Sequence, residues 1–468
     1  MKKLLTLIVT AILAVGCCFG MTACGHEHNY VSTVESAGTC TTTGLTKSTC
    51  SECGDVKETE TPALGHNYKD GKCTRCQATA EGTKYETVNI GLICLHDENS
   101  TYDKNFIDAF KAAATAQGVE YLIKTGIAES SACSEAAVEL IDNGCNLIFA
   151  DSFGHESYII ETAKKYPNVQ FFHATGTKAH ASGLKNYHNA FASIYEGRYL
   201  AGVAAGMKLK AMIDNNEIKA NQKDANGNIK IGYVGAFTYA EVISGFTSWY
   251  LGVKSIVDNI VMDVQFTGSW YDEAGEKSAA NTLIENGCAL ISQHADSWGA
   301  PNACETAGIP NVSYNGSTES QCPNTFIISS RINWQPYYEY IISCAKTGKL
   351  IDTDWTGELG ETFSTGSVNL TELGSKAPAA GTQAKLEEVA AKLKDGSLKV
   401  FDCSKFTVNG KHLTSYMADV DDWGDYVADT QVIKKTDTGI TYFAESEFRS
   451  APYFNIQIDG ITYLNAKY

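Results

Sequence analysis

The chain has little positive charge and no long apolar segment beyond its first residues. It carries 37 lysines and arginines against 54 aspartates and glutamates, a net charge of −17. A surface of that sign repels phosphate backbones, and no basic stripe is present, which argues against nucleic-acid binding. No run after the N-terminal segment reaches the roughly 18 apolar residues of a membrane-spanning helix. These features predict a globular protein that does not span a membrane after that segment.

Signatures of common enzyme classes are also missing. The sequence has no Walker loop, no G-x-S-x-G nucleophile turn and no H-E-x-x-H metal motif. We therefore predict that the protein is not an enzyme.

The first residues have the pattern of an export signal. Lys2 and Lys3 precede an apolar stretch from Leu4 to Val15, so we assign residues 1–23 to a signal peptide. The segment Met21–Gly25 resembles a bacterial lipobox, which predicts that Cys24 is lipidated. Two acyl chains there would anchor the protein stably outside the cytoplasm. Lipidation at Cys17, or secretion without a lipid, are the alternatives.

Residues 24–77 form a small Cys/His unit with a weak internal repeat. His-Asn-Tyr occurs twice, and so does C-x₂-C. Two such pairs separated by about 20 residues are typical of a zinc ribbon, which predicts one structural zinc ion. Its ligands would be Cys50, Cys53, Cys73 and Cys76. Cys40, His28 or His66 could replace one ligand, and disulfides or disorder are the alternatives to zinc.

A polar linker at residues 78–86 leads into alternating strands and helices. The apolar runs expected as strands are Val88–Leu95, Val119–Ile123, Asn146–Ala150, Val169–Phe172, Ile231–Val234, Asp263–Phe266 and Ala289–Ser292. Helical periodicity separates them, which indicates two βαβ series with parallel sheets. A stretch with Gly197, Gly202 and Gly206 lies between the series, and close packing or a crossing between the lobes would explain these glycines. We predict a two-lobed α/β fold like that of periplasmic binding proteins, over residues 87–403.

Aromatic and acidic residues follow two strands of the second series. The segment from Gly268 to Ser297 contains Trp270 and Asp296, each just past the carboxyl end of an apolar run. Ligands bind at that edge in open α/β sheets. Aromatic faces beside a carboxylate suit a flat ring that carries hydroxyl or amine groups, so we predict a small-molecule receptor.

Residues 89–401 resemble the basic membrane protein family, which are lipoprotein receptors of ABC importers and include purine nucleoside receptors. The resemblance rests on seven blocks in order, namely 103–106, 151–154, 194–202, 231–237, 269–272, 293–297 and 333–338. It implies an ABC permease as partner, with no cofactor in the binding domain. It also implies a purine nucleoside or nucleobase as ligand, clamped between lobes that close by a hinge.

The resemblance also implies roles for single residues. Phe106 and Phe237 would stack on the two faces of the ligand, and Trp270 would form a wall of the site. Asp296 would accept hydrogen bonds from ribose hydroxyls or a ring N–H. The further expected ligand contacts are Asp103, Asn105, Asp151 and Arg331.

The chain departs from the family pattern in two places. A loop from His96 to Tyr102 replaces the family's Gly-rich entry to the first helix, which weakens the purine assignment. Residues 404–468 are not covered well; Val408–Lys411 and Ile458–Thr462 look hairpin-like there, and we predict an added β element. A sensory ectodomain and a sugar-type binding protein are the alternative functions. A nucleoside hydrolase is less favoured, because an aspartate run for calcium is missing.

Overall fold

The computed structural model describes residues 28–421 and 429–465. The predicted signal peptide and Cys24 lie outside the described residues. In the described part of the chain, every helix is too short or too polar to cross a bilayer. The chain divides into two compact units, Met1–Gly38 with Thr43–Pro62, and Thr39–Thr42 with Ala63–Tyr468.

The first unit is a three-stranded antiparallel sheet with almost no core. Its strands are β1 (Tyr30–Ser36), β2 (Gly44–Cys50) and β3 (Val56–Thr61). Serine, threonine, lysine and glutamate fill most strand positions, and the side chains of β1 and β3 are mainly exposed. Backbone pairing therefore holds this sheet together more than apolar burial does.

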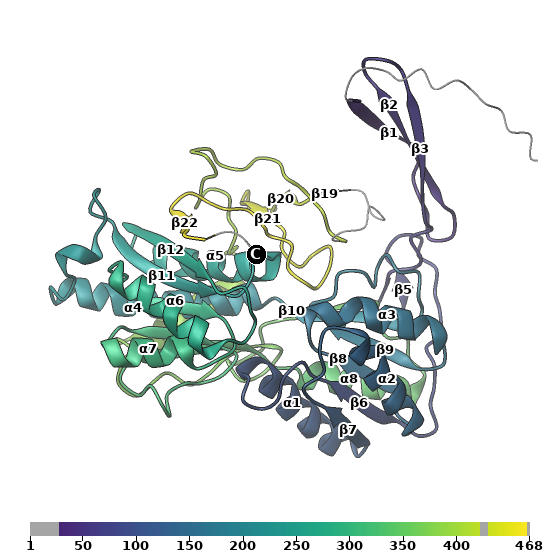
Figure 1. The fold of residues 1–468 in the computed structure, drawn as a ribbon, viewed down its shortest axis with the longest axis horizontal. Coiled ribbons are helices and arrows are strands. Elements are labelled where there is room, and N and C mark those ends of the chain that lie inside the picture. Colours follow the sequence, from purple (N-terminus) through teal and green to yellow (C-terminus); the bar gives the residue numbers. More distant parts are fainter. Residues whose placement is uncertain (1–27, 422–428, 466–468) are drawn as a thin grey trace, which may run out of the picture. The chain divides into compact units, whose positions relative to one another are not determined.

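The second unit contains two α/β lobes (Figure 1), each around a mostly parallel sheet. The sheet of the first lobe has the order β16-β10-β9-β8-β6-β7, and every pair in it is parallel. Its strands are β6 (Asn89–Ile93), β7 (Glu120–Lys124), β8 (Leu147–Ala150), β9 (Gln170–Ala174), β10 (Tyr187–Ala192) and β16 (Asp354–Gly357). The helices of this lobe are α1 (Thr101–Gln117), α2 (Ser131–Asp142), α3 (Glu156–Lys165) and α8 (Gln335–Thr347).

The second lobe repeats this arrangement. Its sheet has the order β17-β15-β14-β13-β11-β12-β22, and only the β15–β17 pair is antiparallel. The strands are β11 (Ile229–Gly235), β12 (Ile260–Phe266), β13 (Ile291–His294), β14 (Asn311–Tyr314), β15 (Phe326–Ile332), β17 (Val368–Leu370) and β22 (Ile461–Tyr463). Its helices are α4 (Ile194–Asp214), α5 (Ala240–Lys254), α6 (Glu273–Glu285), α7 (Gly299–Ala307) and α9 (Thr382–Lys394). The predicted fold class is confirmed.

The chain passes between the lobes three times. The crossings lie between β10 and α4, between β15 and α8, and between β16 and β17. Lobes joined by a few short crossings can rotate about a common hinge.

Glycines in α4 allow it to pack closely on α5. A Cβ atom on Gly202 would come within 2.2 Å of the Trp249 carbonyl oxygen, and one on Gly206 within 2.9 Å of Ile256 Cβ. The predicted close packing is therefore confirmed for these two positions, and both contacts lie within the second lobe. Gly197 instead faces Val368 in β17.

The C-terminal residues complete the second lobe. The predicted turn at Val408–Lys411 is present, with Val408 N–H donating to the Lys411 carbonyl at 2.8 Å. The second predicted hairpin is wrong, because β22 joins the edge of the sheet parallel to β12. Phe443 and Phe454 lie in the same apolar core as Phe401, which stacks on Phe454 at 4.4 Å. This tail therefore shares the core of the lobe it covers.

Candidate functional site

A cavity lies at the carboxyl ends of the central strands of both lobes. The empty space there, open solvent included, is about 370 Å³. The lining residues are Leu95, His96, Tyr102, Asp103, Ser152, Phe153 and Thr175 from the first lobe, with Glu241, Trp270, His294 and Asp296 from the second. In each lobe they follow the strands where the sheet order reverses, the usual ligand position in open α/β sheets.

Asp103 is fixed at the start of α1 on the first-lobe side. The helix is capped by Ser100, whose hydroxyl accepts from the Asp103 N–H and donates to the carboxylate at 2.6 Å. The His96 backbone N–H donates to the other carboxylate oxygen at 2.7 Å. Burial acts to raise the pKa of Asp103, but the hydrogen bonds from His96 and Ser100 outweigh it and lower the pKa. Asp103 is therefore a charged acceptor.

Asp296 and Trp270 form the opposite side. The Asp296 N–H donates to the Trp270 carbonyl at 3.0 Å, which ties the loop after β13 to the loop after β12. Among residues 28–421 and 429–465, no side chain or backbone group donates to the Asp296 carboxyl group. Burial raises the pKa of Asp296 well above its usual value, with smaller contributions from nearby carboxylates such as Asp103. A ligand that donates to this group would stabilise its ionised form.

A second acidic group of the same lobe faces the cavity. Glu241 lies at the start of α5, and its carboxylate is 3.4 Å from Nε2 of His294. The His294 ring packs on Tyr314 with centroids 4.7 Å apart. Burial lowers the pKa of His294 despite the hydrogen bond with Glu241. The imidazole is therefore neutral near pH 7.

The two lobes touch each other around the cavity. The Thr101 hydroxyl donates to the Asp296 carbonyl at 3.1 Å. Phe153 of the first lobe stacks on Tyr239 of the second, with ring centroids 5.0 Å apart. These contacts describe a closed arrangement, and the open form that we expect without ligand stays a prediction.

The chemistry of the lining defines a class of ligand. Aromatic side chains supply stacking surfaces, and Asp103, Glu241 and Asp296 supply acceptors for hydroxyl or N–H donors. The lining includes no lysine or arginine. A phosphorylated or carboxylate ligand would face uncompensated repulsion there. The cavity suits a neutral or cationic ring compound with several donors.

The structure brings some of the predicted ligand residues to this cavity. Asp103, Trp270 and Asp296 line it directly. Asp151 lies immediately behind, where its carboxylate accepts from the Leu95 N–H at 3.2 Å. Burial raises the pKa of Asp151 well above its usual value, and Asp103 raises it further. Asp151 therefore does not line the cavity itself but holds the backbone of the lining residue Leu95.

Three other predicted ligand residues belong to the core or to β15. Phe106 is fully buried and stacks on Trp334, with ring centroids 4.4 Å apart. The Asn105 side chain donates to the Ile332 carbonyl, which fastens α1 to the end of β15. Arg331 lies in β15, and neither it nor Asn105 is among the lining residues. The stacking role predicted for Phe106 is wrong, because its face of α1 turns into the first lobe.

Phe237 is partly exposed and packs against the lining residue Trp270. Its ring stacks on Tyr239 at 5.1 Å and meets the edge of Trp270 at 4.9 Å. It does not line the cavity and holds the Trp270 ring in place. Neither Phe106 nor Phe237 is among the lining residues, and the phenyl, phenol and indole rings that line the cavity are Tyr102 and Phe153 from the first lobe and Trp270 from the second.

Sequence reasoning gave no ligand role to Phe153, Thr175 or Glu241, and it named Tyr102 only as the end of the loop from His96 that we expected near the ligand. Phe153 follows β8 within a family-like block, so the strand-end rule could have found it. Tyr102 sits one position from Asp103 on α1, and its hydroxyl donates to the Asp151 carbonyl at 2.8 Å. Its direction depends on the rotation of α1, which local sequence does not reveal.

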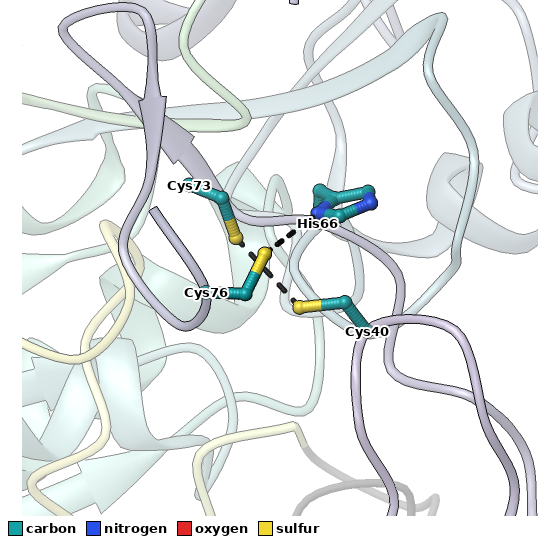
Figure 2. A group of neighbouring side chains, drawn as sticks. All are labelled: Cys40, His66, Cys73 and Cys76. Carbon is teal, nitrogen blue, oxygen red and sulfur yellow. Dashed lines mark hydrogen bonds between the residues drawn. The ribbon is translucent and has the colours of Figure 1, made fainter. Parts of the chain in front are cut away.

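The Cys/His residues form two groups, not the one predicted. Cys40, His66, Cys73 and Cys76 converge in the second unit, and Figure 2 shows their side chains pointing toward one another. In the first unit, His28 lies with Cys50 and Cys53. In each group the donor atoms lie within 4.8 Å of one another. The predicted ligand set of Cys50, Cys53, Cys73 and Cys76 is therefore wrong as a single site, since the two C-x₂-C pairs belong to different units.

Comparison with known proteins finds relatives that are named as binding proteins. A purine-binding protein of Brucella abortus is 29% identical over 276 residues, which cover 58% of this chain and 71% of that protein. A Haloferax volcanii protein named as an ABC transporter glucose-binding protein is 28% identical over 339 residues, covering 71% and 80%. An ABC transporter nucleoside-binding protein of Lactococcus lactis is 25% identical over 235 residues, covering 48% and 61%.

Solved structures share the fold. A solute-binding protein of Conexibacter woesei superposes with a TM-score of 0.52 at 17% identity, covering 67% of this chain and 98% of its own. A solute-binding protein of Aeropyrum pernix superposes with a TM-score of 0.54 at 16% identity, and the match covers 69% of this chain and 94% of that protein.

A family model matches the part of the chain that holds the cavity. The model is described as ABC transporter substrate-binding protein, PnrA-like, and it matches residues 94–358. That span is more than half of the chain and contains every lining residue. With its two lobes and the closed cavity between them, this chain belongs to the PnrA-like family of ABC transporter substrate-binding proteins.

Proposed function

We propose that the protein is the receptor of an ABC importer for a purine nucleoside. Substrate-binding proteins of ABC transporters work outside the cytoplasm, where they bind a small solute and deliver it to a permease. In this proposal Cys24 carries a lipid that keeps the receptor at the membrane surface. The protein changes no covalent bond, and the closing of the lobes around the solute presents it for transport.

The observation that carries the proposal is the composition of the cavity wall. A purine ring can stack on Trp270 or Phe153, which stabilises a bound base by about 1–3 kcal/mol per stacked ring. Ribose hydroxyls can donate to Asp296 and Asp103, both at strand or helix ends that fix their position. The relatives named for purine and nucleoside binding support the same ligand class.

A panel of ligands tests this function. We expect adenosine, guanosine or inosine to raise the melting temperature and to bind in the micromolar range or tighter by calorimetry. The corresponding 5′-monophosphate should bind at least about 100-fold more weakly, because the lining lacks a cation. Equal affinity for nucleoside and nucleotide would contradict this view of the cavity.

A sugar is the second candidate ligand. Aromatic rings beside carboxylates also suit a pyranose, and the relative named for glucose binding covers the larger share of this chain. Glucose and ribose therefore belong in the same panel. A melting shift with glucose and none with nucleosides would replace the purine assignment and keep the receptor function, whereas no shift with either class would count against both.

A further inference from the structure

We propose that Cys40, His66, Cys73 and Cys76 bind one structural zinc ion that joins the turn Thr39–Thr42 to the segment Ala63–Gln77, which covers the edge of the first lobe. This site takes one donor from the turn at Thr39–Thr42 and three from the second repeat. It differs from a ribbon made of two C-x₂-C pairs, because Cys50 and Cys53 take no part.

The donor distances match a tetrahedral ion. A tetrahedron with zinc–sulfur bonds of about 2.3 Å has sulfur–sulfur edges of about 3.8 Å and sulfur–nitrogen edges of about 3.6 Å. The Sγ atoms of Cys40 and Cys73 are 3.7 Å apart, and Cys76 Sγ is 3.3 Å from His66 Nδ1 (Figure 2). A disulfide would bring two sulfurs to about 2.05 Å. Three thiolates and one imidazole are a usual ligand set for structural zinc.

Both repeats fold the same backbone turn around their C-x₂-C pair. In the second repeat Cys73 N–H donates to the Ala78 carbonyl at 2.8 Å, and Gln77 N–H donates to the Cys73 carbonyl at 2.9 Å. In the first repeat Cys50 and Gly54 make the corresponding bonds, at 2.8 and 2.9 Å. Gln77 and Gly54 both have positive φ angles, 60° and 74°. A left-handed backbone at a glutamine is costly, and it persists where the surroundings require it.

Each histidine is also oriented in the same way. The His66 ring stacks on Tyr68 with centroids 5.4 Å apart, and His28 stacks on Tyr30 at 5.3 Å. The second cysteine of each pair lies next to Nδ1 of the histidine, at 3.3 Å for Cys76 and 3.4 Å for Cys53. The repeated sequence therefore encodes a repeated donor arrangement.

Cys40 is placed as the fourth donor by the chain around it. The Leu64 N–H donates to the Thr39 carbonyl at 2.9 Å, which holds the turn that carries Cys40 next to the second repeat. Cys40 belongs to the preceding repeat in sequence, since it lies before the first C-x₂-C pair. The ion thus joins two stretches of chain that share little apolar contact.

The ligated segment is attached to the edge strand of the first lobe. The Thr353 N–H donates to the Tyr68 carbonyl at 2.9 Å, and the Tyr68 N–H donates to the Thr353 hydroxyl at 2.9 Å. Arg75 lies between the two ligand cysteines of its pair, and its guanidinium donates to the His180 carbonyl at 2.7 Å. These bonds cover the edge of the sheet next to β16, a place where an unpaired strand would invite association. In this proposal the zinc ion stabilises the conformation of the segment Ala63–Gln77, which covers this edge.

Metal analysis of the full chain tests the ligand set. The double variant Cys50→Ser, Cys53→Ser removes the thiolates of the first repeat, and we expect it to keep about one zinc ion per chain when purified reduced and without chelator. Adding Cys40→Ser or His66→Ala should weaken zinc binding at least about 100-fold. The matched control is Cys403→Ser, the same substitution at a buried thiol of the body. It should leave zinc content and zinc affinity unchanged. Loss of zinc from the double variant, or an unchanged affinity after Cys40→Ser, would overturn the proposal.

Three further measurements guard against a variant that fails to fold. Five of the six tryptophans, between residues 249 and 355, lie in the described part of the two-lobed body, so their fluorescence reports the folding of that body. In the unsubstituted chain, cobalt(II) should give tetrahedral absorption bands that Cys40→Ser weakens and Cys403→Ser leaves intact. Chelation should speed hydrogen exchange at 63–77 and β16 while the cavity loops keep their protection. A disulfide involving Cys40, Cys73 or Cys76 in the metal-loaded protein would also overturn the site.

Discussion

The two-lobed body and the segment Ala63–Gln77 are parts of one compact unit that reach order by different means. The body buries large apolar clusters around both sheets, and its binding residues stand on the ends of rigid strands and helices. Within Ala63–Gln77, all of it described, only Tyr68 and Cys73 are buried. A segment this poor in core needs cross-links or a metal. The comparison teaches that the body is ordered by apolar burial, whereas the segment Ala63–Gln77 lacks such a core and, in our proposal, is held by metal–ligand bonds.

The comparison predicts that single changes in the cavity alter affinity without altering metal content. The largest effect should come from Asp296→Ala, because it removes a buried acceptor that the ligand is expected to use. Hydrogen bonds to charged groups contribute about 1.5–3 kcal/mol, so we expect roughly 100-fold weaker binding of the best nucleoside by calorimetry. Asp108→Asn, at an exposed carboxylate of α1, is the control and should bind normally. An unchanged affinity for Asp296→Ala would remove this residue from the site.

The body also carries buried carboxyl groups whose ionisation costs stability. Burial raises the pKa of Glu445 to about 7, although the N–H groups of Tyr453 and Phe454 donate to it. A raised folded-state pKa gives stability that is present below about pH 4.5 and lost as the pH rises through about 7.

Replacing Glu445 removes this pH dependence. The difference in unfolding free energy between Glu445→Gln and the unsubstituted chain should grow by about 2 kcal/mol in favour of the variant as the pH rises from 5 to 8. Urea unfolding followed by tryptophan fluorescence measures it, and exposed Glu387→Gln is the control. A parallel pH profile for Glu445→Gln and the unsubstituted chain would contradict the assignment.

A smaller effect is expected from the aromatic wall. Trp270→Ala removes a stacking surface and should weaken nucleoside binding about tenfold, within the range for one stacked base. Phe237→Leu should cost only about threefold, because Phe237 acts by supporting the Trp270 ring. Calorimetry on the two variants gives the ratio of their nucleoside affinities. This ratio distinguishes a residue that lines the cavity, such as Trp270, from one that only packs behind a lining residue, such as Phe237. A larger loss from Phe237→Leu would place that ring against the ligand.

The smallest effect should come from removing the metal. Zinc in the segment Ala63–Gln77 lies outside the cavity lining, so chelation should change nucleoside affinity by less than about twofold. The same calorimetric titration with and without chelator measures this. A tenfold change would show that the two regions are coupled and that the comparison above fails.

The fold was largely readable from the sequence. Near-continuous apolar runs such as Ile90–Ile93 can only be strands buried on both faces, and helical periodicity between them fixes a parallel sheet. The cavity was predictable in place but less so in detail. Trp270 and Asp296 follow from the rule that ligands meet strand ends, and Asp103 was implied by the family resemblance. Phe106 and Tyr102 lie close together on one helix, and the sequence favoured the buried one.

The amino-acid order by itself determined the βαβ series, the acidic and aromatic strand ends and the repeated His-Asn-Tyr and C-x₂-C motifs, because each depends on neighbours in the chain. Only the tertiary structure decided which face of α1 meets the cavity and that Cys40 joins the second repeat while Cys50 and Cys53 stay with the first. Helix rotation and donor grouping depend on packing between segments far apart in sequence, and local pattern carries no record of that packing.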